Sequence, residues 1–454
     1  MMERSDLGKK LDIALGGLGM KLNYKRTILI GFAFLSICAF WQFYDNEIPK
    51  ILKYNFNLGE TATGAIMALD NVFALFMLPF FGALSDKTDT KFGKRIPYIL
   101  AGTFLAIVFL VTLIQLARPS GNLVFFIIIL LMLLVSMGIY RSPAVSLMPD
   151  LTPAPLRSAG NAIINLMGAL GGVFTLVMTI VLLKSADNPA DTNYTPLMLS
   201  IVILMAVSVC ILVLTTREKE IKKQIEKEGG LKSLGEQIEK EENTSDSTKK
   251  LPKEVYKSLC FLLMSVAFWY MAYNAVTTAY TRYVEEVWNL RDGGYATTLL
   301  IATVAAVLSY IPIGFISGII GRKKTILGGV VIMTICYLVA AFMPDYSSSI
   351  NIFFALIGIG WAAINVNSYP MVVEMSKSGD IGKYTGTYYT FSMAAQVFTP
   401  ILSGMLLEYI SYRTLFPYAV VFSVLAFCSM MMVKHGDVKP PKKENILENF
   451  DVDD

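Results

Sequence analysis

The chain has 454 residues, of which 54% are hydrophobic and 16% charged, and its mean hydropathy is +0.55. This charged fraction is low for a soluble globular protein, so the composition excludes that class and indicates a polytopic membrane protein. The formal net charge of +4 is small. The single histidine, His435, follows the last apolar run, so any proton coupling inside the membrane must use carboxylates.

Windows poor in charge and long enough to cross about 30 Å of hydrocarbon predict twelve membrane spans. In chain order they are residues 27–50, 61–84, 96–117, 123–148, 158–183, 195–214, 257–281, 295–320, 324–344, 350–373, 382–408 and 414–433. We therefore expect an all-α membrane protein.

A strongly charged stretch divides these spans into two groups of six, which predicts five parts of the chain. They are an N-terminal cytoplasmic segment (1–26), an N-terminal six-helix bundle (27–214), a charged cytoplasmic linker (215–256), a C-terminal six-helix bundle (257–433) and a cytoplasmic tail (434–454). We interpret the linker as a solvated connection, helical in part at most, with a regulatory or partner-binding role as the alternative.

The basic residues gather on one side of the membrane when the spans are threaded in order. They include Lys21, Lys25 and Arg26, the island 82–97, Arg322 to Lys324 and the stretch 434–443. The positive-inside rule then places both termini in the cytoplasm, and we expect a multi-pass protein of the plasma membrane without a cleaved signal peptide.

The island 82–97 follows the second span and contains Gly82, Ser85 and Asp86, then Gly93, Lys94, Arg95 and Pro97. A related turn at 314–324 follows the eighth span and ends in Gly321, Arg322, Lys323 and Lys324. Gly318 stands where the first copy has Asp86, so we expect the network of the second turn to be weaker or to use another acid, such as Glu374. Phe40-Trp41 and Asn46 likewise recur 228 residues later as Phe268-Trp269 and Asn274. The two halves are therefore repeats of one six-span unit.

Six plus six spans with these two basic turns resemble the major facilitator superfamily over nearly the whole chain. The long first turn, with six residues between Asp86 and Gly93, resembles that of the sucrose transporters and of the glycoside-pentoside-hexuronide cation symporters, in a bacterial form. The stretch from Pro143 to Asp150 is similar to the same group. Leu134 stands where the plant sucrose transporters carry a coupling aspartate, so coupling residues cannot be copied over directly.

Three charged residues within the spans are candidates for coupling, because an unpaired charge in hydrocarbon costs at least about 2.5–3.5 kcal/mol. Asp70 is the first candidate, followed by Asp45 and Arg141. Protonation of Asp70 could be linked to sugar binding. Arg141 could bind a sugar hydroxyl or act as a counter-charge. The alternatives are a structural carboxylate at Asp70 and a solvated helix end at Asp45.

Sugar sites combine amides and charged groups, which bind hydroxyls, with aromatic rings, which stack on the apolar face of the sugar. The resemblance implies that spans one, four, seven and ten line the cavity. Besides Arg141, the candidates in these spans are Trp41, Gln42, Tyr44, Asn46, Trp269, Tyr270, Tyr273, Asn274, Trp361, Asn365 and Asn367. Interfacial belts and simple packing are the alternative. We interpret Asn161, Asn165 and Gln396 as contacts between helices.

The basic turns are candidate elements of an inner gate. The residues concerned are Gly82, Asp86, Gly93, Lys94, Arg95, Gly321, Arg322, Lys323 and Lys324. A charge network among them would hold the cytoplasmic side closed in the outward-open state. Determination of topology by positive charge is a compatible alternative.

Together these features predict a cation-coupled symporter that carries a sugar, a disaccharide or other glycoside, by alternating access. A multidrug or metabolite efflux antiporter of the same fold is the alternative. The five cysteines lie singly in five spans, and no nucleophile motif, metal cluster or phosphate loop is present in the sequence, so we expect no enzyme and no cofactor. The expected partners are the sugar and the lipid bilayer, with no nucleic acid, and the protein is expected to act as a monomer. Proton is favoured over sodium as the coupling ion, but both remain open.

Overall fold

The computed structural model describes residues 22–118, 121–152, 157–184, 186, 188–228, 252–291, 293–375 and 381–437, and all statements below concern these residues. Within them, the side chains of 157–159, 224–228, 373 and 381–383 are not described. Most of the expected N-terminal segment, most of the linker and most of the tail therefore lie outside the described residues.

The N-terminal half consists of helices joined by short turns. They are α2 (Tyr24–Tyr54), α3 (Glu60–Met67), α4 (Leu69–Asp86), α5 (Ile96–Leu116), α6 (Leu123–Asp150), α7 (Arg157–Leu182) and α8 (Thr195–Thr215), followed by α9 (Glu218–Glu228) in the linker. The predicted second span is thus two helices, α3 and α4, which meet at Ala68.

The C-terminal half repeats this arrangement. Its helices are α11 (Lys253–Val287), α12 (Gly294–Ile320), α13 (Arg322–Ala341), α14 (Ile350–Met375), α15 (Ile381–Tyr409) and α16 (Leu415–Met431), with single 3-10 turns at Pro189–Asp191 and Tyr412–Thr414. Twelve segments of the described chain are long and apolar enough to cross a membrane. The prediction of an all-α membrane protein with twelve spans is confirmed.

Two spans extend well beyond their predicted ends. The first was expected at 27–50 and α2 runs from Tyr24 to Tyr54, while the seventh was expected at 257–281 and α11 runs from Lys253 to Val287. A window that counts charges stops at the first cluster of them. At the C-terminal ends of both helices the helix continues because this cluster is paired across the halves, Lys50 with Glu285 and Lys53 with Glu286.

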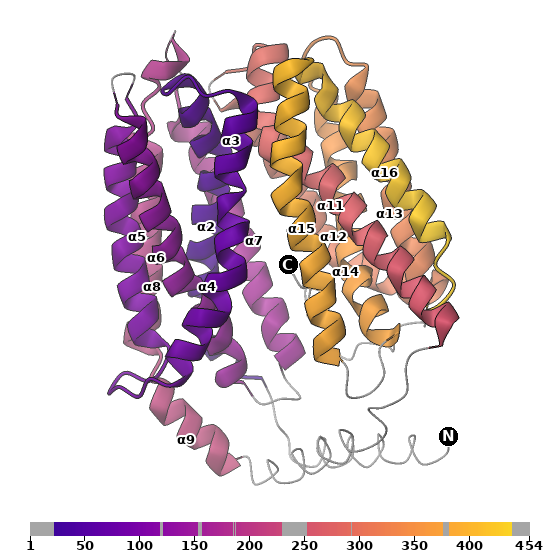
Figure 1. Cartoon of the computed structure of the whole chain (residues 1–454). Coiled ribbons are helices and arrows are strands. Elements are labelled where there is room, and N and C mark those ends of the chain that lie inside the picture. The colour runs from indigo at the N-terminus through magenta and orange to yellow at the C-terminus, as the bar shows by residue number, and fades with distance from the viewer. Residues whose placement is uncertain are drawn as a thin grey trace.

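The two halves lie side by side (Figure 1), and each has its own core of buried apolar side chains. Across the boundary α3 packs on α15 and α7 packs on α12, which are equivalent pairs if the halves are related by a pseudo-twofold axis. The first contact is very close. A Cβ atom on Gly64 would lie 2.1 Å from the carbonyl oxygen of Pro400, so glycine is required for this approach.

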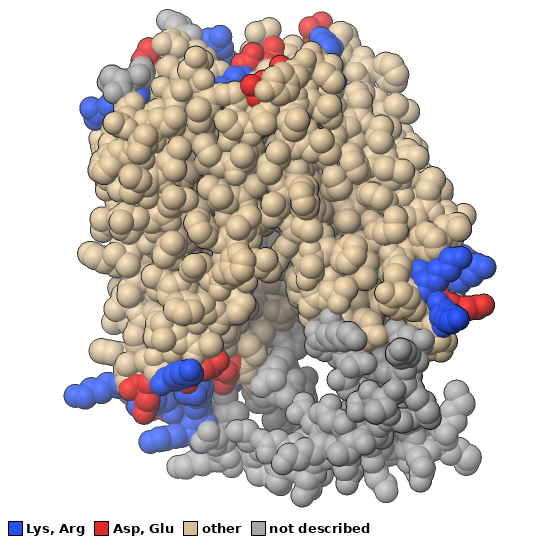
Figure 2. Space-filling view, in the orientation of Figure 1, with Lys and Arg blue, Asp and Glu red and all other residues tan. Residues whose placement is uncertain are grey.

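The two ends of the bundle differ. We call the end with the 82–97 turn, α9 and Arg322 the basic end, and the opposite end, where α2 meets α3, the latch end. Polar contacts join the halves at the latch end, and the surface seen in Figure 2 is hollowed between the halves toward the basic end. The molecule is therefore closed at one end.

Candidate functional site

A central cavity of about 470 Å³ lies between the halves. Helices α2, α6 and α7 line it on one side and α11, α12, α14 and α15 on the other. Six of the residues predicted from the sequence lie in its wall: Trp41, Gln42, Asp45, Arg141, Tyr273 and Trp361. The cavity thus brings together candidates from all four of the spans that the resemblance pointed to.

Aromatic rings form two parts of this wall. Tyr273 of α11 stacks on Trp361 of α14, with ring centroids 3.8 Å apart and planes 2° from parallel. In the other half, the guanidinium carbon of Arg141 lies 5.8 Å from the centre of the Trp41 ring, a cation–π contact that holds Arg141 beside the cavity. Flat apolar surface and fixed positive charge are therefore both available to a solute.

Asp45 and Arg141 are the charged groups of the wall. Within the described part of the chain, neither makes a hydrogen bond or an ion pair with another side chain, although each lies within electrostatic range of the other. Both charges therefore remain available to a ligand, a cation or a proton that enters the cavity.

Asp70, the first coupling candidate, is not among the residues that line the cavity. It lies in the first turn of α4, just after the break at Ala68. One of its oxygens accepts hydrogen bonds from the backbone N–H of Asn71, at 2.5 Å, and from the Asn71 side chain, at 2.7 Å. Its carboxylate interacts electrostatically with Arg141, but the two form no ion pair.

Seven of the predicted substrate residues also lie outside the cavity wall: Tyr44, Asn46, Trp269, Tyr270, Asn274, Asn365 and Asn367. Trp269 is 1% exposed in the core of the C-terminal half, and Asn367 donates to the Ala363 carbonyl of its own helix. Successive helical positions differ by about 100°, so only one in three or four can face the cavity.

Other residues of the wall were missed or interpreted differently. Asn161 and Asn165, interpreted above as contacts between helices, line the cavity from α7, and Thr303, Tyr310 and Tyr389 line it from the C-terminal half. The spacing of four between the two asparagines places them on one helical face, which was the available signal.

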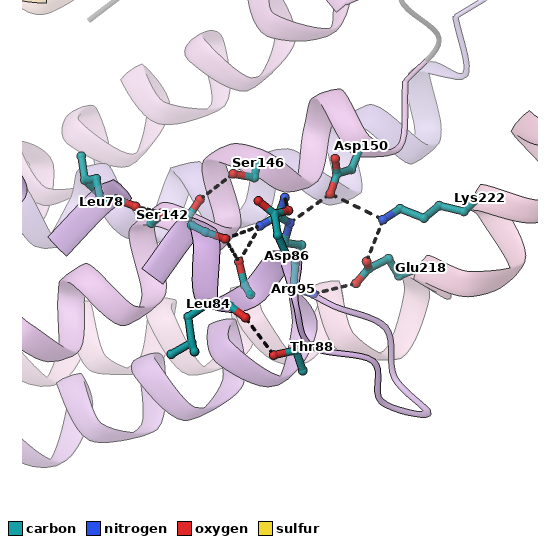
Figure 3. Close-up of polar contacts among 12 residues, drawn as sticks. Leu78, Leu84, Asp86, Thr88, Arg95, Ser142, Ser146, Asp150, Glu218 and Lys222 are labelled. Atoms are coloured by element: carbon teal, nitrogen blue, oxygen red, sulfur yellow. Dashed lines mark hydrogen bonds and ion pairs between the residues drawn. The ribbon is translucent and has the colours of Figure 1, made fainter. Parts of the chain in front are cut away.

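Arg95 is the centre of a polar network at the basic end (Figure 3). Its guanidinium donates to Asp86 at 2.5 Å, to Asp150 at 3.0 Å and to Ser85 at 2.5 Å. It also donates to the carbonyl of Gly82. All of these partners belong to the N-terminal half, so in this state the network ties spans two, three and four together and does not join the halves.

The linker helix α9 completes this network, which the sequence did not indicate. Glu218 accepts a hydrogen bond from the backbone N–H of Arg95 at 3.0 Å, and Lys222 lies 3.5 Å from Asp150. Gly93 has φ of +112°, and a Cβ atom there would lie 2.2 Å from Glu218. Glycine is therefore needed twice at this position, for its backbone conformation and for the space that Glu218 occupies.

The exposed part of the turn also contacts α9. Lys219 lies 2.7 Å from Asp89, and this hydrogen bond and charge hold the pKa of the Asp89 carboxyl below its usual range. Lys94 is half-buried and makes no ion pair with a described residue.

The second basic turn uses the acid that the sequence indicated. Arg322 pairs with Glu374 at 2.8 Å, where the first turn uses Asp86. Lys323 donates to the carbonyls of Met431 and Val433 at the end of α16, and Lys324 is exposed. Gly321 has φ of +94°. This turn is thus tied to its own half, as the first one is.

The latch end carries the charged contacts between the halves, and none of its residues was predicted. Glu60 of α3 accepts a hydrogen bond from Arg282 of α11 at 2.8 Å and lies 3.7 Å from Lys53. Lys53 lies 2.6 Å from Glu286. One turn earlier on α2, Lys50 lies 2.6 Å from Glu285. We call these residues, with Glu47, the latch.

Charged residues near the ends of spans usually face water, so the sequence offered little to single them out. Their partners are more than two hundred residues away in the chain, and nothing in the local pattern connects the two segments.

The family model of the Major Facilitator Superfamily matches residues 30–308 of this chain and, a second time, residues 262–450. The chain belongs to this superfamily. Its members are transporters, which agrees with the central cavity and with the latch that joins the halves at one end of the described chain. The superfamily part of the resemblance is therefore confirmed.

Curated relatives add little detail. An uncharacterized MFS-type transporter from Mycobacterium tuberculosis (strain CDC 1551 / Oshkosh) is 28% identical over 169 residues, which cover 37% of this chain and 24% of the relative. A protein of the same description from strain H37Rv matches equally. The chain thus spans about a quarter of the length of the curated relatives it matches.

Solved structures share the fold over nearly the whole chain. The nucleoside transporter NupG has a TM-score of 0.64 at 16% identity, covering 90% of this chain and 100% of NupG. A bacterial homologue of the iron transporter ferroportin in an inward-facing state has a TM-score of 0.65 at 13% identity, and the match covers 90% of this chain and 99% of the homologue. The inward-open xylose transporter XylE from E. coli has a TM-score of 0.63 at 14% identity, and the match covers 93% of this chain and 97% of XylE. At these identities the likeness concerns the fold alone.

Proposed function

We propose that this transporter carries out symport of a sugar, a disaccharide or other glycoside, together with a cation, by alternating access. The observation that carries the proposal is the wall of the central cavity, which combines the stacked Tyr273–Trp361 pair with Asp45, Arg141 and Gln42. Aromatic faces bind the apolar side of a sugar ring, and the charged and amide groups bind its hydroxyls.

The favoured coupling residue is now Asp45, with Asp70 second. Asp45 lines the cavity without a hydrogen-bond partner among the described residues, whereas Asp70 is bonded to Asn71 and lies outside the wall. A bare carboxylate in a site shielded from bulk water is stabilised by a bound proton or cation, and a sugar bonded nearby changes that balance. Proton remains favoured over sodium.

We propose that the basic end faces the cytoplasm, with both termini there, and that the membrane is the plasma membrane. The positive-inside rule supports this orientation, because the basic turns and the start of α9 lie at that end (Figure 1). The latch then closes the outer side, and the structure is an inward-facing state. Two of the similar structures are described as inward-facing or inward-open, which agrees with this assignment.

The sucrose-transporter-like and glycoside-pentoside-hexuronide branch remains our proposal for the position within the superfamily. It rests on the long 82–97 turn, in which Arg95 reaches both Asp86 and Asp150. We further propose that the transporter acts as a monomer in the bilayer, needs no cofactor and binds no nucleic acid.

The efflux antiporter is the second candidate, since a multidrug site would need a large apolar, methionine-rich wall. Among the described residues that line the cavity, none is a methionine, and the wall contains Asp45, Arg141, Gln42, Asn161 and Asn165. These residues favour a hydroxylated solute.

Uptake into proteoliposomes tests the proposal. A panel of labelled sugars is offered under a proton gradient or a sodium gradient, and we expect one gradient to drive accumulation of one sugar. Asp45→Asn is expected to bind that sugar without concentrating it, and Asp70→Asn is the matched control that retains part of the accumulation. Accumulation in Asp45→Asn equal to that of the unaltered protein would show that Asp45 is not the coupling residue. Efflux of loaded drugs without sugar uptake would favour the antiporter.

A further inference from the structure

The first basic turn contains six residues that the second one lacks. They run from Lys87 to Phe92, whereas only two residues separate Gly318 from Gly321 in the second turn. None of the six lines the central cavity or bonds to the Arg95 guanidinium. The proposed transport site therefore does not explain why the first turn is long.

These residues form a hairpin that is fixed by its own hydrogen bonds. The backbones of Thr90 and Gly93 exchange two bonds, at 3.3 and 3.1 Å, and the Thr90 hydroxyl donates to the Gly93 carbonyl. The Thr88 hydroxyl bonds to the Leu84 carbonyl on α4 and to the Tyr98 hydroxyl on α5. We call residues 87–94 the first-turn hairpin. Its side chains are carried on a backbone that is held at both ends.

The tip of the first-turn hairpin combines one aromatic ring with basic groups. Phe92 is 69% exposed, and Lys87 and Lys91 are exposed on either side of it in the sequence. Neither ammonium group makes an ion pair or a hydrogen bond with a described residue. Asp89 is already paired with Lys219 of α9. The two lysines thus have no acid of the described chain to neutralise them.

The neighbourhood of the hairpin has an excess of positive charge even when every acid is counted. Residues 86–95, Asp150 and the start of α9 (217–223) contain eight basic and five acidic side chains. The acids are engaged with Arg95, Arg217, Lys219 and Lys222. Figure 2 shows basic side chains that protrude at this corner of the molecule. The surface is therefore suited to a partner with negative charge.

The first-turn hairpin also lies where the membrane surface is expected. It joins α4 to α5 at the outer edge of the N-terminal half, away from the other half (Figure 1). On α5, Leu100 and Phe104 are 51% and 65% exposed, and a membrane-spanning helix presents such residues to hydrocarbon. Leu100 is only about 6 Å along the axis from the start of α5. The hairpin is thus at the level of the lipid headgroups.

We propose that the first-turn hairpin is a binding surface for anionic phospholipids, with Phe92 inserted at the boundary between headgroups and acyl chains and Lys87 and Lys91 at the lipid phosphates. Aromatic side chains are favourable at this boundary, and basic side chains beside a membrane attract anionic lipids. A soluble acidic protein fits less well, because a stable interface needs about 800 Å² on each partner and the hairpin presents a single large apolar side chain.

The surface belongs to the N-terminal half alone, because the short second turn has no residues from which to build a hairpin. Through Asp89 and Gly93 the hairpin contacts α9, so a lipid bound at its tip also holds the place where α9 docks. This inference is independent of the cargo and of the coupling ion.

A spin label in place of Phe92 tests the position of the tip. The label is attached to Phe92→Cys after the five native cysteines are replaced. The full chain is placed in nanodiscs of phosphatidylcholine alone or mixed with phosphatidylglycerol, without sugar. Collisions of the label with oxygen, which concentrates in the membrane, are compared with collisions with a water-soluble nickel complex. Both leaflets of a nanodisc have the same composition, so the result does not depend on which end is cytoplasmic.

We expect the ratio of oxygen to nickel collisions to rise when phosphatidylglycerol is present and to fall again at high salt, which screens the lysines. The double variant Lys87→Gln/Lys91→Gln should lose most of this rise. Lys324→Gln, at an exposed lysine of the second turn, is the matched control and should retain it.

Hydrogen exchange of the unlabelled chain gives a second measurement that keeps Phe92. Phosphatidylglycerol should slow exchange in residues 87–92 by about fivefold for each lysine that contacts a headgroup. Phe92→Ser should remove part of this protection, although its exposed side chain is not needed for folding.

The same collision ratio in both lipid compositions would overturn the proposal. A label that stays in water in both would do so in favour of a soluble partner, and one that is equally deep in both would show that the anionic charge plays no part. An equal loss in Lys324→Gln and in the double variant would show that the lysines of the hairpin are not a specific surface. Sugar uptake is not part of either measurement, so failure here leaves the proposed function untouched.

Discussion

The pair between Glu60 and Arg282 is expected to set the balance between the two states of the transporter. Arg282 Nε donates to Glu60 at 2.8 Å, and the two side chains are 6% and 4% exposed. Tyr412 donates to the other oxygen of Glu60 at 2.5 Å. Glu60→Gln removes the charge that Arg282 and Lys53 share, while it keeps the size of the side chain.

The size of the effect follows from burial. Breaking a buried ion pair by removing one partner costs about 3–5 kcal/mol, because the remaining charge is left without compensation. The cost falls on the closed latch alone, since Arg282 reaches water when the halves separate. At about 3 kcal/mol, the ratio of closed to open latch should fall about a hundredfold.

Spin labels on Gln115→Cys, at the end of α5, and Ser348→Cys, before α14, report the distance between the halves at the latch end and measure this ratio in a background without the five native cysteines. Glu60→Gln, Arg282→Gln and the double variant form a cycle, and the double variant should be no more open than the more open single variant. Additive effects of the two single changes would show that Glu60 and Arg282 act separately and do not form the pair that holds the latch. An unchanged ratio in Glu60→Gln would show that the pair does not hold the latch.

Three further changes test other contacts of the structure. Gly64→Ala should also open the latch, because its Cβ atom would lie 2.1 Å from the Pro400 carbonyl oxygen, and the same pair of labels measures the opening. Gly93→Ala should detach α9, because the new methyl group meets Glu218 and the φ of +112° disfavours alanine, so hydrogen exchange in 218–223 should accelerate while α5 stays protected. Trp361→Ala removes the stacking surface and should weaken sugar binding about tenfold or more, measured by isothermal titration; because the ring is buried, the change should also lower the thermal stability.

The fold was predictable because burial in a membrane imposes a simple rule on the sequence. Each span must carry about twenty apolar residues, and the twelve windows correspond to the twelve long helices. The break at Ala68 was not predictable, since neither glycine nor proline marks it. The C-terminal ends of α2 and α11 were missed because their charges are paired across the halves.

The site was predictable only in part, for a geometric reason. Trp41 and Trp361 reach the cavity, whereas Trp269, the repeat counterpart of Trp41, is packed inside its own half. Residue type shows what a side chain can bind, but these spans are apolar on nearly all sides, so the pattern does not show which face points to the cavity. The ranking of Asp45 and Asp70 as coupling candidates depended on the same missing information, because only Asp45 lines the cavity.

The contact between Gly93 and Glu218 also bears on how the protein is made. Synthesis proceeds from the N-terminus, so Asp86, Arg95 and Asp150 are made well before Glu218 and Lys222 are added. The polar network of the first six spans is complete only once the start of the linker has emerged. The network around Arg95 therefore has all of its partners before the first residue of the seventh span is synthesised.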